Sequence, residues 1–421
     1  MEIPSSFHPV GSGARAMGMG GAFMAIADDA TAASWNPGGL VQVSRAEFSL
    51  VLSGLDRKED NDFTLRPEAS GEEYVREENI NFLSASRPFY LFRRNMVFSL
   101  TYQHLFDFGR EWEFVFVQKE SPLRTVEQWD FLQEGALTAI GLSYCIQITP
   151  RFSAGFTFSL WDDDLTSNHW KQRYRMAGEG SLGLEPVSYS LDKTVDYSFT
   201  GSNFNIGILW RIRDNIGLAA VFKTPFTADT DYRFSKTVRQ SYPDDGGPKN
   251  RADDTVISEY EKRNDELDMP LSYGIGFVYD FSDIFSLSGD FFRTEWGNFV
   301  YREENGKESS AVSGLPLSES DVKAAHQIRV GAEYRMIRPE QNCVIPIRGG
   351  LFYDPAPAEG NPDDIYGFSL GLGFSKNERY SLDFAYQFRF GNSMGESLVK
   401  NAGFSQDRHE HKIYLSLILY M

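Results

Sequence analysis

The feature that most constrains the fold is a strict alternation of apolar residues with small or polar ones. It is clearest in the segment YSLDFAYQFRF, residues 380–390. The even-numbered residues of this segment are apolar or aromatic, namely Tyr380, Leu382, Phe384, Tyr386, Phe388 and Phe390. Successive side chains of a strand point to opposite faces, so the alternation predicts a β-strand with one wholly apolar face.

The same alternation recurs along the chain, in residues 204–212, 271–281, 328–335 and 366–375. The positions opposite the apolar rows are mostly glycine, serine or charged residues. A β-sandwich needs inward faces that are apolar and close-packed, and these faces are neither. Apolar rows that face lipid around a hydrophilic interior are typical of an outer-membrane β-barrel.

The connections between the expected strands alternate in length. The short ones are residues 87–95, 149–151, 213–215, 282–284, 338–342 and 376–378. The long polar ones, expected to be loops, are residues 56–78, 109–124, 162–193, 240–253, 304–325, 356–363 and 392–410. Short periplasmic turns and long outer loops mark such barrels, and the alternation predicts an all-β, transmembrane, antiparallel β-barrel of about 14 strands. Residues 96–117 and 255–281 are expected to form strands that project beyond the membrane.

Composition narrows the functional classes. The 421-residue chain has a formal net charge of -18, whereas nucleic-acid binding needs a surplus of lysine and arginine, so no nucleic-acid partner is expected. No apolar run approaches the roughly 20 residues of a membrane helix. The start, Met1-Glu2-Ile3, has neither the basic nor the apolar region of a secretory signal. For a protein of the bacterial cell outer membrane, we therefore expect the signal peptide to be absent from this numbering.

Motifs that could indicate catalysis or metal binding have simpler explanations. The segment GFSLG, residues 367–371, has the letters of a nucleophile elbow, but Ser369 lies in unbroken alternation rather than at a strand-to-helix turn. His409 and His411 could form a metal pair, yet no third ligand is evident. We therefore expect no catalytic residues, no metal and no cofactor, and we do not expect an enzyme.

The first 45 residues differ in texture from the rest. A barrel of this size has a lumen that wall side chains cannot fill, so it holds a plug or a channel. Residues 1–45 are rich in glycine and alanine and precede the first expected strand, residues 46–55. We expect them to form an N-terminal hatch, or plug, inside the lumen, with residues 46–421 as the barrel. Asp28 or Asp29 is expected to cap a short helix, and Pro37 to end it.

The segment GARAMGMGGAFMAIADDATAASWNPGGL, residues 13–40, resembles the hatch of the long-chain fatty-acid outer-membrane transporter family (FadL-like, OMPP1/TodX). The residues that carry this hatch motif are Gly21, Asp28, Asp29, Asn36, Pro37 and Gly38. Weaker matches are MPLSYGIGFVYDF and IRGGLFYDPAP, so the resemblance covers nearly the whole chain in order. One departure is Gly38, where the family commonly has alanine.

The resemblance implies a mechanism. The chain is expected to be a porin-like channel for passive uptake of long-chain fatty acids or other small hydrophobic compounds, gated by a shift of the hatch. Ligand is expected to leave through a gap in the wall beside an inward kink of the third strand. We place this strand kink at Asp107, Phe108 and Gly109, because glycine favours bends. Asn36 and Pro37 are expected to fix the hatch against the wall.

A ligand pocket is expected where large side chains interrupt the small inner faces. On the hatch these are Phe7, Met17, Met19, Phe23 and Met24, and on the wall Trp161, Phe292, Trp296 and Phe352. The same side chains could simply pack the hatch against the wall, and the two interpretations are compatible. Arg329 and Arg348, inward on neighbouring strands, could pair with Glu333 and Asp354 or meet a ligand carboxylate.

The expected partners are a hydrophobic small molecule, either a fatty acid or a hydrocarbon, together with outer-membrane lipid and lipopolysaccharide around a monomer. An alternative is an accessory barrel of a protein secretion or surface-attachment complex without transport activity. Transport predicts an apolar cavity that reaches the hatch. The accessory role predicts a lumen packed shut.

Overall fold

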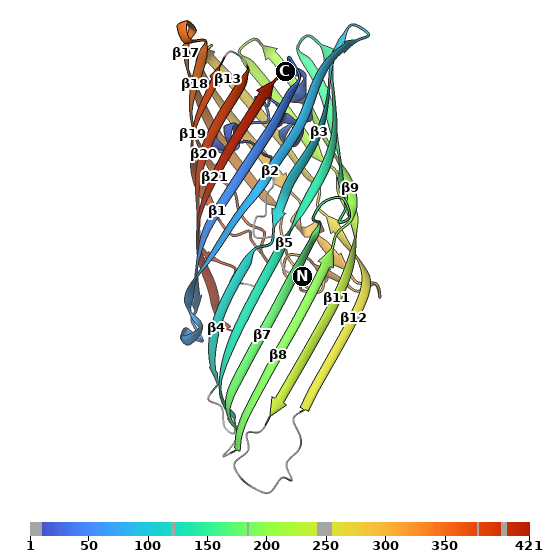
Figure 1. Ribbon diagram of the computed structural model, residues 1–421, viewed down its shortest axis with the longest axis vertical. Coiled ribbons are helices and arrows are strands. Elements are labelled where there is room, and N and C mark those ends of the chain that lie inside the picture. The colour runs from blue at the N-terminus through green and yellow to red at the C-terminus, as the bar shows by residue number, and fades with distance from the viewer. Residues whose placement is uncertain (1–10, 119–122, 183–184, 242–254, 377–378, 397–401) are drawn as a thin grey trace.

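A computed structural model of the chain describes residues 11–118, 123–182, 185–241, 255–376, 379–396 and 402–421. Within these residues, fourteen antiparallel strands form a closed ring, in which β21 pairs back onto β1 (Figure 1). The ring strands are, in order, β1 (Glu47–Phe63), β2 (Gly71–Leu91), β3 (Arg94–Asp107), β5 (Leu123–Thr149), β6 (Phe152–Trp161), β9 (Gly201–Arg213), β10 (Ile216–Lys223), β13 (Ser272–Ser282), β14 (Phe285–Thr294), β17 (Ala325–Arg338), β18 (Cys343–Tyr353), β19 (Tyr366–Lys376), β20 (Tyr380–Met394) and β21 (Phe404–Tyr420).

The alternation in sequence corresponds to an outer and an inner face of the ring. On β19 and β20, Leu370 and Phe384 point outward and are 58% and 43% exposed, whereas the inward Ser369 and Asp383 are buried. An exposed apolar row of this kind is stable in lipid rather than in water. The predicted all-β barrel of about 14 strands is therefore confirmed.

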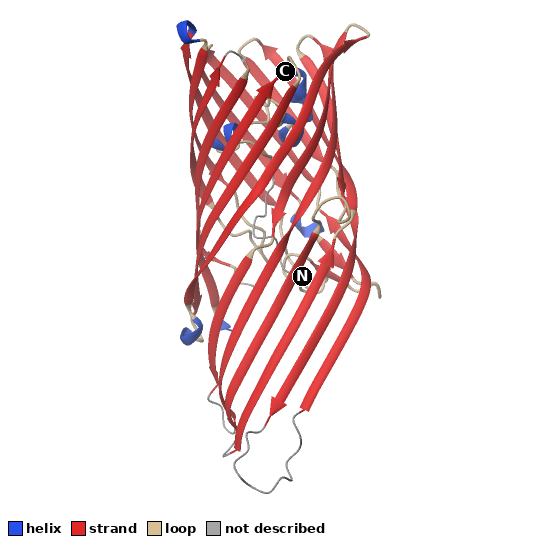
Figure 2. Ribbon diagram, viewed as in Figure 1, coloured by secondary structure: helices blue, strands red, loops and turns tan. Residues whose placement is uncertain are grey.

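In the part of the chain that the structure describes, seven further strands lie outside the ring order, and Figure 2 shows several of them continuing the sheet at the end opposite the short turns. They are β4 (Arg110–Gln118), β7 (His169–Leu182), β8 (Glu185–Ser198), β11 (Phe226–Ser241), β12 (Thr255–Met269), β15 (Val300–Arg302) and β16 (Glu308–Ser310). We call β4, the first half of β5, β7, β8, β11 and β12 the outer sheet. β5 connects it to the ring, because its second half pairs with β3 and β6 and its first half with β4 and β7.

The observed strands correct two expectations. Much of the sequence expected to form long loops is strand, including residues 56–63, 71–78 and 169–182. Conversely, residues 96–117 and 255–281 are not continuous strands, since the first is broken at residues 108–109 and the second at residues 270–271. Proline cannot donate to a sheet ladder, which explains the break at Pro270.

The two faces of the outer sheet differ in chemistry. On the inner face, Trp170 is sandwiched between the rings of Phe108 and Tyr197, at centroid distances of 4.8 and 4.7 Å. On the other face, charged pairs such as Arg175 and Asp192 are exposed to solvent. Because water satisfies the charged face, these strands do not need the apolar rows that mark the ring.

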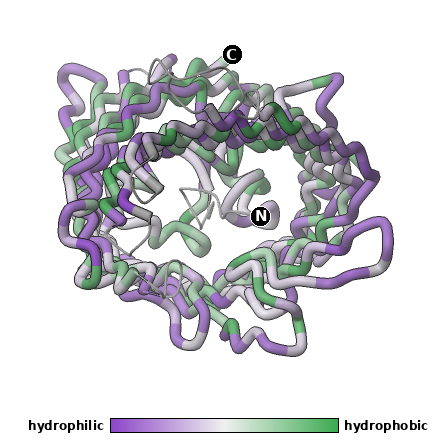
Figure 3. Tube along the Cα trace, turned by 90° about the horizontal axis from the view of Figure 1, so that it is seen from below, coloured by the Kyte–Doolittle hydropathy of each residue, from purple (hydrophilic) through white to green (hydrophobic). Residues whose placement is uncertain are grey.

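Residues 11–45, here called the N-terminal segment, lie inside the ring, as the view along the barrel shows (Figure 3). They contain the helices α1 (Ala14–Gly18) and α2 (Ala32–Trp35) and the 3-10 helix η1 (Pro37–Gln42). The remaining 3-10 turns are η2 (Pro67–Ala69), η3 (Trp296–Asn298) and η4 (Pro339–Gln341). α1 packs against β18 to β21, and η1 against β3, β5, β6 and β9, so the segment spans the ring from one wall to the other.

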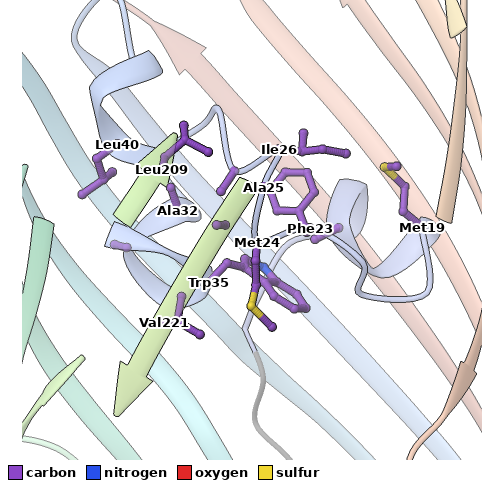
Figure 4. Close-up of a cluster of buried hydrophobic side chains, with 14 of the residues drawn as sticks. Met19, Phe23, Met24, Ala25, Ile26, Ala32, Trp35, Leu40, Leu209 and Val221 are labelled. Atoms are coloured by element: carbon purple, nitrogen blue, oxygen red, sulfur yellow. The ribbon is translucent and has the colours of Figure 1, made fainter. Parts of the chain in front are cut away.

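A small hydrophobic core joins the N-terminal segment to the wall (Figure 4). Phe23, Met24 and Trp35 are fully or almost fully buried, and Leu209 and Val221 of the wall belong to the same cluster. Burying one such side chain stabilises by about 1.5–3 kcal/mol. Among the described residues, no helix has both the length and the apolar character needed to cross a bilayer.

Candidate ligand-binding site

Small polar side chains of the inner wall bind the backbone of the N-terminal segment. Ser369 Oγ accepts a hydrogen bond from Gly20 N at 2.7 Å and donates one to Gly18 O at 3.0 Å. Across the lumen, Ser153 Oγ donates to Gly38 O at 2.7 Å. Buried backbone groups without regular secondary structure need such partners. The serines that ruled out a dry sandwich core therefore satisfy the backbone of the chain inside the barrel.

Asn36 and Pro37 contact the wall at a place where it has no side chains. Asn36 Nδ2 donates to Ile208 O at 3.0 Å and to Met24 O at 2.9 Å, and its Oδ1 accepts from Gly38 N at 3.0 Å. A Cβ at Gly207 of the wall would lie 2.8 Å from Pro37 Cδ. The Asn-Pro-Gly element thus fits against the wall only because Gly207 is glycine.

Ion pairs that are partly or fully buried connect the N-terminal segment to the wall. Arg15 pairs with Asp28 of the same segment and, at 3.1 Å, with Glu333 of β17. Glu333 also pairs with Arg348 at 2.7 Å, and Arg348 with Asp383 at 2.6 Å. Arg348 therefore makes ion pairs within the wall, and no cavity described below includes it.

Arg329 links two parts of the lumen. It pairs with Asp354 at 3.2 Å and donates to Gly20 O at 3.0 Å, directly beside Gly21. Gly21 itself has a φ of +76°, which side chains other than glycine rarely adopt. Arg329 thus stabilises a glycine turn of the N-terminal segment.

The expected cap of the short helix takes a different form. α2 begins after Thr31, which makes no side-chain cap, and Asp29 Oδ1 instead accepts a hydrogen bond from Thr31 N at 2.9 Å. Asp29 therefore stabilises the turn before the helix, while Asp28 is engaged by Arg15. The helix ends at Trp35, two residues before Pro37.

A cavity of about 100 Å³ lies between the N-terminal segment and the outer sheet, inside the barrel. Residues Ala33 and Ser34 of the segment form part of its lining. Its apolar lining consists of Leu105, Phe106, Trp161, Phe226, Met269, Pro270, Phe292 and Trp296. The cavity is thus apolar along much of its wall and reaches the segment that fills the lumen.

The predicted residues Trp161, Phe292 and Trp296 meet in this cavity, although they come from three different elements. Trp161 ends β6, where its Nε1 donates to Asn203 Oδ1 at 3.0 Å and its ring stacks on Phe226 at 6.1 Å. Phe292 lies on β14, directly over Gly274, which has no side chain to displace it. Trp296 lies in η3, immediately after β14.

Lys223 brings a cation to the cavity. It is half-buried at the end of β10, and its Nζ lies 5.6 Å from the ring centroid of Phe292. A cation over an aromatic face is attracted by the ring quadrupole. Among the described residues that line this cavity, Lys223 is the one ionisable side chain.

The other predicted pocket residues lie elsewhere. Met17, Arg329 and Phe352 line a separate, mostly polar cavity of about 70 Å³ in the lumen. Met19, Phe23 and Met24 are fully buried between the segment and the wall and line neither cavity. Phe7 lies outside the described residues.

Sequence reasoning missed several residues of the apolar cavity. Phe106, Phe226 and Met269 stand at or near strand ends, where the alternation that marks an inward position is interrupted. The neighbouring Pro270 was a usable signal, because proline within an alternating run indicates a strand end. Nothing in the sequence marked Lys223 as a cavity residue, because it is one lysine among many polar residues.

The residues predicted to form the strand kink lie at a break in the wall. Asp107 ends β3, Phe108 and Gly109 connect the strands, and β4 begins at Arg110. The register between β3 and β5 shifts between His104 and Phe106. Ligand release at this place remains a prediction.

Comparisons with known proteins agree with this architecture. The chain matches the family described as "Outer membrane protein transport protein (OMPP1/FadL/TodX)" over residues 9–407. No curated protein matches it at the level of sequence. A FadL homologue of Pseudomonas aeruginosa is similar in structure with a TM-score of 0.62 at 15% identity, covering 97% of this chain and 98% of that one.

Two further solved structures are similar across the whole fold. The toluene transporter TodX of Pseudomonas putida has a TM-score of 0.57 at 13% identity and covers 98% of both chains. The monoaromatic hydrocarbon channel CymD has a TM-score of 0.57 at 15% identity and covers 99% of both chains. At such identities the likeness shows the fold alone.

The match over most of the sequence establishes the relationship that the hatch motif predicted. The family is one of transport proteins rather than enzymes, and its place is the bacterial outer membrane. This chain belongs to the FadL/TodX family of outer-membrane transport proteins.

Proposed function

We propose that the protein is a monomeric outer-membrane channel for passive uptake of long-chain fatty acids or other small hydrophobic compounds, gated by residues 1–45 as a hatch. The observation that carries the proposal is the apolar cavity whose lining includes Ala33 and Ser34 of that segment. The outward apolar rows of the ring strands contact outer-membrane lipid and lipopolysaccharide. TodX and CymD are named for toluene and monoaromatic hydrocarbons, which supports a hydrophobic substrate here.

The size of the cavity supports gating by the N-terminal segment. A volume of about 100 Å³ suits a ring-sized hydrocarbon or a short piece of an acyl chain. An acyl chain of about 12 carbons would gain roughly 10 kcal/mol if fully buried. The cavity must lengthen to bury a chain of that size. Part of its lining, Ala33 and Ser34, belongs to the N-terminal segment, which can move without breaking the wall of the barrel. A shift of this segment is therefore the proposed opening step.

Lys223 supports a fatty acid over a pure hydrocarbon. Its ammonium group lies beside the apolar lining and over Phe292, where it can bind a carboxylate whose chain occupies the cavity. Energy coupling is not needed, because the polar surface layer rather than the bilayer core holds back such molecules. The channel only has to offer a continuous apolar path across that layer.

The gate can be tested with a reversible cross-link. Thr157 Oγ1 of β6 donates to Ala33 O at 2.8 Å, so the two residues are in direct contact, and we expect cysteines at these two positions to lie close enough to tie the segment to the wall. In a background with serine at Cys145 and Cys343, oxidation of Ala33→Cys/Thr157→Cys should abolish most uptake of decanoate into vesicles. Reduction should restore it.

A matched control joins two wall strands without touching the N-terminal segment. Ser86 Oγ of β2 and Ser99 Oγ of β3 lie 2.7 Å apart, and oxidised Ser86→Cys/Ser99→Cys should transport normally. If the segment-to-wall cross-link leaves uptake unchanged, the segment is a fixed plug. That outcome would favour an accessory role in a secretion or surface-attachment complex.

A further inference from the structure

The wall of the barrel is split between β2 and the β3–β4 connection. β3 pairs with β2 only from Arg94 to Gln103, opposite Leu91 to Phe82. In the described chain, residues 71–81 of β2 pair with β1 alone, so their other edge has no strand partner. Beyond Asp107 the chain turns away at Gly109 and continues as β4 beside β5.

The split forms a cleft of about 620 Å³. One side is the free edge of β2 from Tyr74 to Asn79, and the other is formed by the end of β3, the start of β4 and residues 132–138 of β5. The lining is strongly polar, with five carboxylate side chains against two guanidinium groups. It also offers the amides of Asn79 and Gln133 and the phenol rings of Tyr74 and Tyr102.

Side-chain contacts fix the rim of this wall cleft. Asn79 Nδ2 donates to Asp107 Oδ1 at 3.1 Å, and the His104 ring also contacts Asp107. Arg57 of β1 donates to Gly109 O at 2.8 Å, which anchors the turn after β3. The cleft is thus a built feature whose walls are held from three strands.

Some hydrogen-bonding groups of the wall cleft are available to a ligand. The Glu77 carboxyl group interacts with Asp107, but its Oε2 atom is buried and has no hydrogen-bond partner among the described residues. Glu77 lines both the wall cleft and the polar lumen cavity. The unpaired edge of β2 adds backbone donors and acceptors along the same side. A buried polar atom without a hydrogen bond lowers the stability of the fold. A ligand hydroxyl group that donates a hydrogen bond to the Glu77 carboxylate would remove that cost, which favours binding.

The wall cleft lies at the outer border of the lipid-facing surface. Along β2, the outward side chains change from apolar to charged between Ile80, which is 47% exposed, and Glu78 and Arg76. Lipid headgroups lie at such a border. A ligand in the cleft therefore meets the headgroup layer on one side and the lumen on the other.

The chemistry of the wall cleft restricts its ligand. A hydrocarbon gains nothing from charged and amide groups that must be desolvated. A phosphate is disfavoured by the excess of carboxylates. Carboxylates and amides can exchange paired hydrogen bonds with neighbouring hydroxyls, while the faces of Tyr74 and Tyr102 can pack on C–H surfaces.

We propose that the wall cleft binds a hydroxyl-rich saccharide unit, either neutral or amine-bearing. The unit is the headgroup of an outer-leaflet glycolipid or a free saccharide from the medium. The wall cleft shares no lining residue with the apolar cavity, although Asp107 and Gly109 of the predicted ligand exit form part of its rim. Saccharide binding is therefore measured separately from transport.

The test is a binding measurement on the full-length protein in lipid nanodiscs. Free lactose, N,N′-diacetylchitobiose and glucosamine are titrated in one arm by saturation-transfer NMR, using phosphatidylcholine nanodiscs. In the other arm, phosphatidylcholine nanodiscs carry lactosylceramide, and contacts of its sugar with the protein are measured. Saturable binding of a free sugar identifies a soluble ligand, and sugar contacts in the lactosylceramide arm alone identify a glycolipid headgroup.

Variants at exposed cleft positions keep the test independent of folding. Tyr74 is 52% exposed and Glu134 is also exposed, so Tyr74→Ala and Glu134→Ala should fold normally and weaken binding by about tenfold. The matched controls are Tyr260→Ala and Glu179→Ala, whose side chains are also exposed, on the outer sheet, but lie outside the cleft. Binding should be unchanged in both controls.

Three results would overturn the proposal. The first is no saturable binding in either arm. The second is an equal loss of binding in cleft and control variants. The third is displacement of the sugar by inorganic phosphate, which would assign an anion site instead. Uptake of a fatty acid is measured on the same preparations. Loss of saccharide binding with normal uptake would overturn this proposal and leave the transport proposal standing.

Discussion

The inner face of the ring and the inner face of the outer sheet follow the same two-residue alternation, yet they carry opposite kinds of side chain. In the ring, the inward positions are small or polar, as with Ser369 and Gly331, and the N-terminal segment occupies the space they leave. In the outer sheet, the inward positions include Trp170 and Tyr197, whose rings fill the space themselves. The size of the inward residues therefore indicates whether another part of the chain lies against a strand.

The largest predicted difference between the two regions concerns their ion pairs. Arg348→Met in the ring leaves the buried carboxylates of Glu333 and Asp383 without their shared partner, which should cost about 3–5 kcal/mol of the free energy of unfolding. Arg175→Met in the outer sheet removes an exposed pair with Asp192 and should cost less than about 1 kcal/mol. Urea titration in lipid vesicles measures both.

The two variants remove the same charge and insert the same side chain, so each controls the other. Equal costs for both would mean that water reaches the lumen at Arg348. The N-terminal segment would then not shield that part of the wall.

A smaller effect is expected where the ring makes room for the N-terminal segment. A Cβ at Gly331 would lie 2.8 Å from Met19 Cβ, so Gly331→Val should displace the segment at a cost of about 1–3 kcal/mol. Protease should then cut within residues 11–45 more readily than in the native protein. Gly349→Val on the neighbouring β18 is the control, because its Cβ would meet nothing closer than Ser369 O at 3.8 Å. Equal cleavage of both variants would contradict the role assigned to Gly331.

The ring was predictable because its inward positions are mostly small or polar, in contrast to the apolar outward rows. Residues 366–374 show this rule without interruption, and enough other segments do so to set the strand number. The outer sheet was not predictable in this way. In β7, the alternation of Trp170 and Tyr174 with charged residues ends at Gly178 and Gly180, which is also what a loop looks like.

The apolar cavity was predictable only in part. Trp161, Phe292 and Trp296 were found because a large residue stands out on a small inner face. Phe352 satisfies the same rule but lies in the polar cavity, since position along the barrel axis cannot be read from alternation. Two residues that line the wall cleft, Asp107 and Gly109, were predicted as part of the strand kink, but its other polar residues were not, because they come from strands whose pairing ends there and no sequence pattern marks an absent partner.

The smallest predicted effect tests whether protonation of a carboxyl group in an outer loop changes the stability of that loop without changing the stability of the ring. Asp363, in the loop after β18, accepts a hydrogen bond from Gly395 N at 2.8 Å, and burial, with Glu396 and Asp364 nearby, raises the pKa of Asp363 to about 6. The folded loop thus binds this proton more tightly than the unfolded chain, whose carboxyl titrates near its ordinary value. Stability of the loop should therefore rise as pH falls from about 7 to about 4, by about 1 kcal/mol for a partly exposed group.

Amide hydrogen exchange at Gly395, corrected for intrinsic rates, measures this gain. Asp363→Asn should abolish it, because the amide cannot ionise, while amides of the ring such as that of Gly331 should not respond to pH in either protein. A pH response that persists in Asp363→Asn would place the titrating group elsewhere. A response shared by Gly331 would show that the outer loops and the ring unfold together, which would remove the energetic boundary between the two regions.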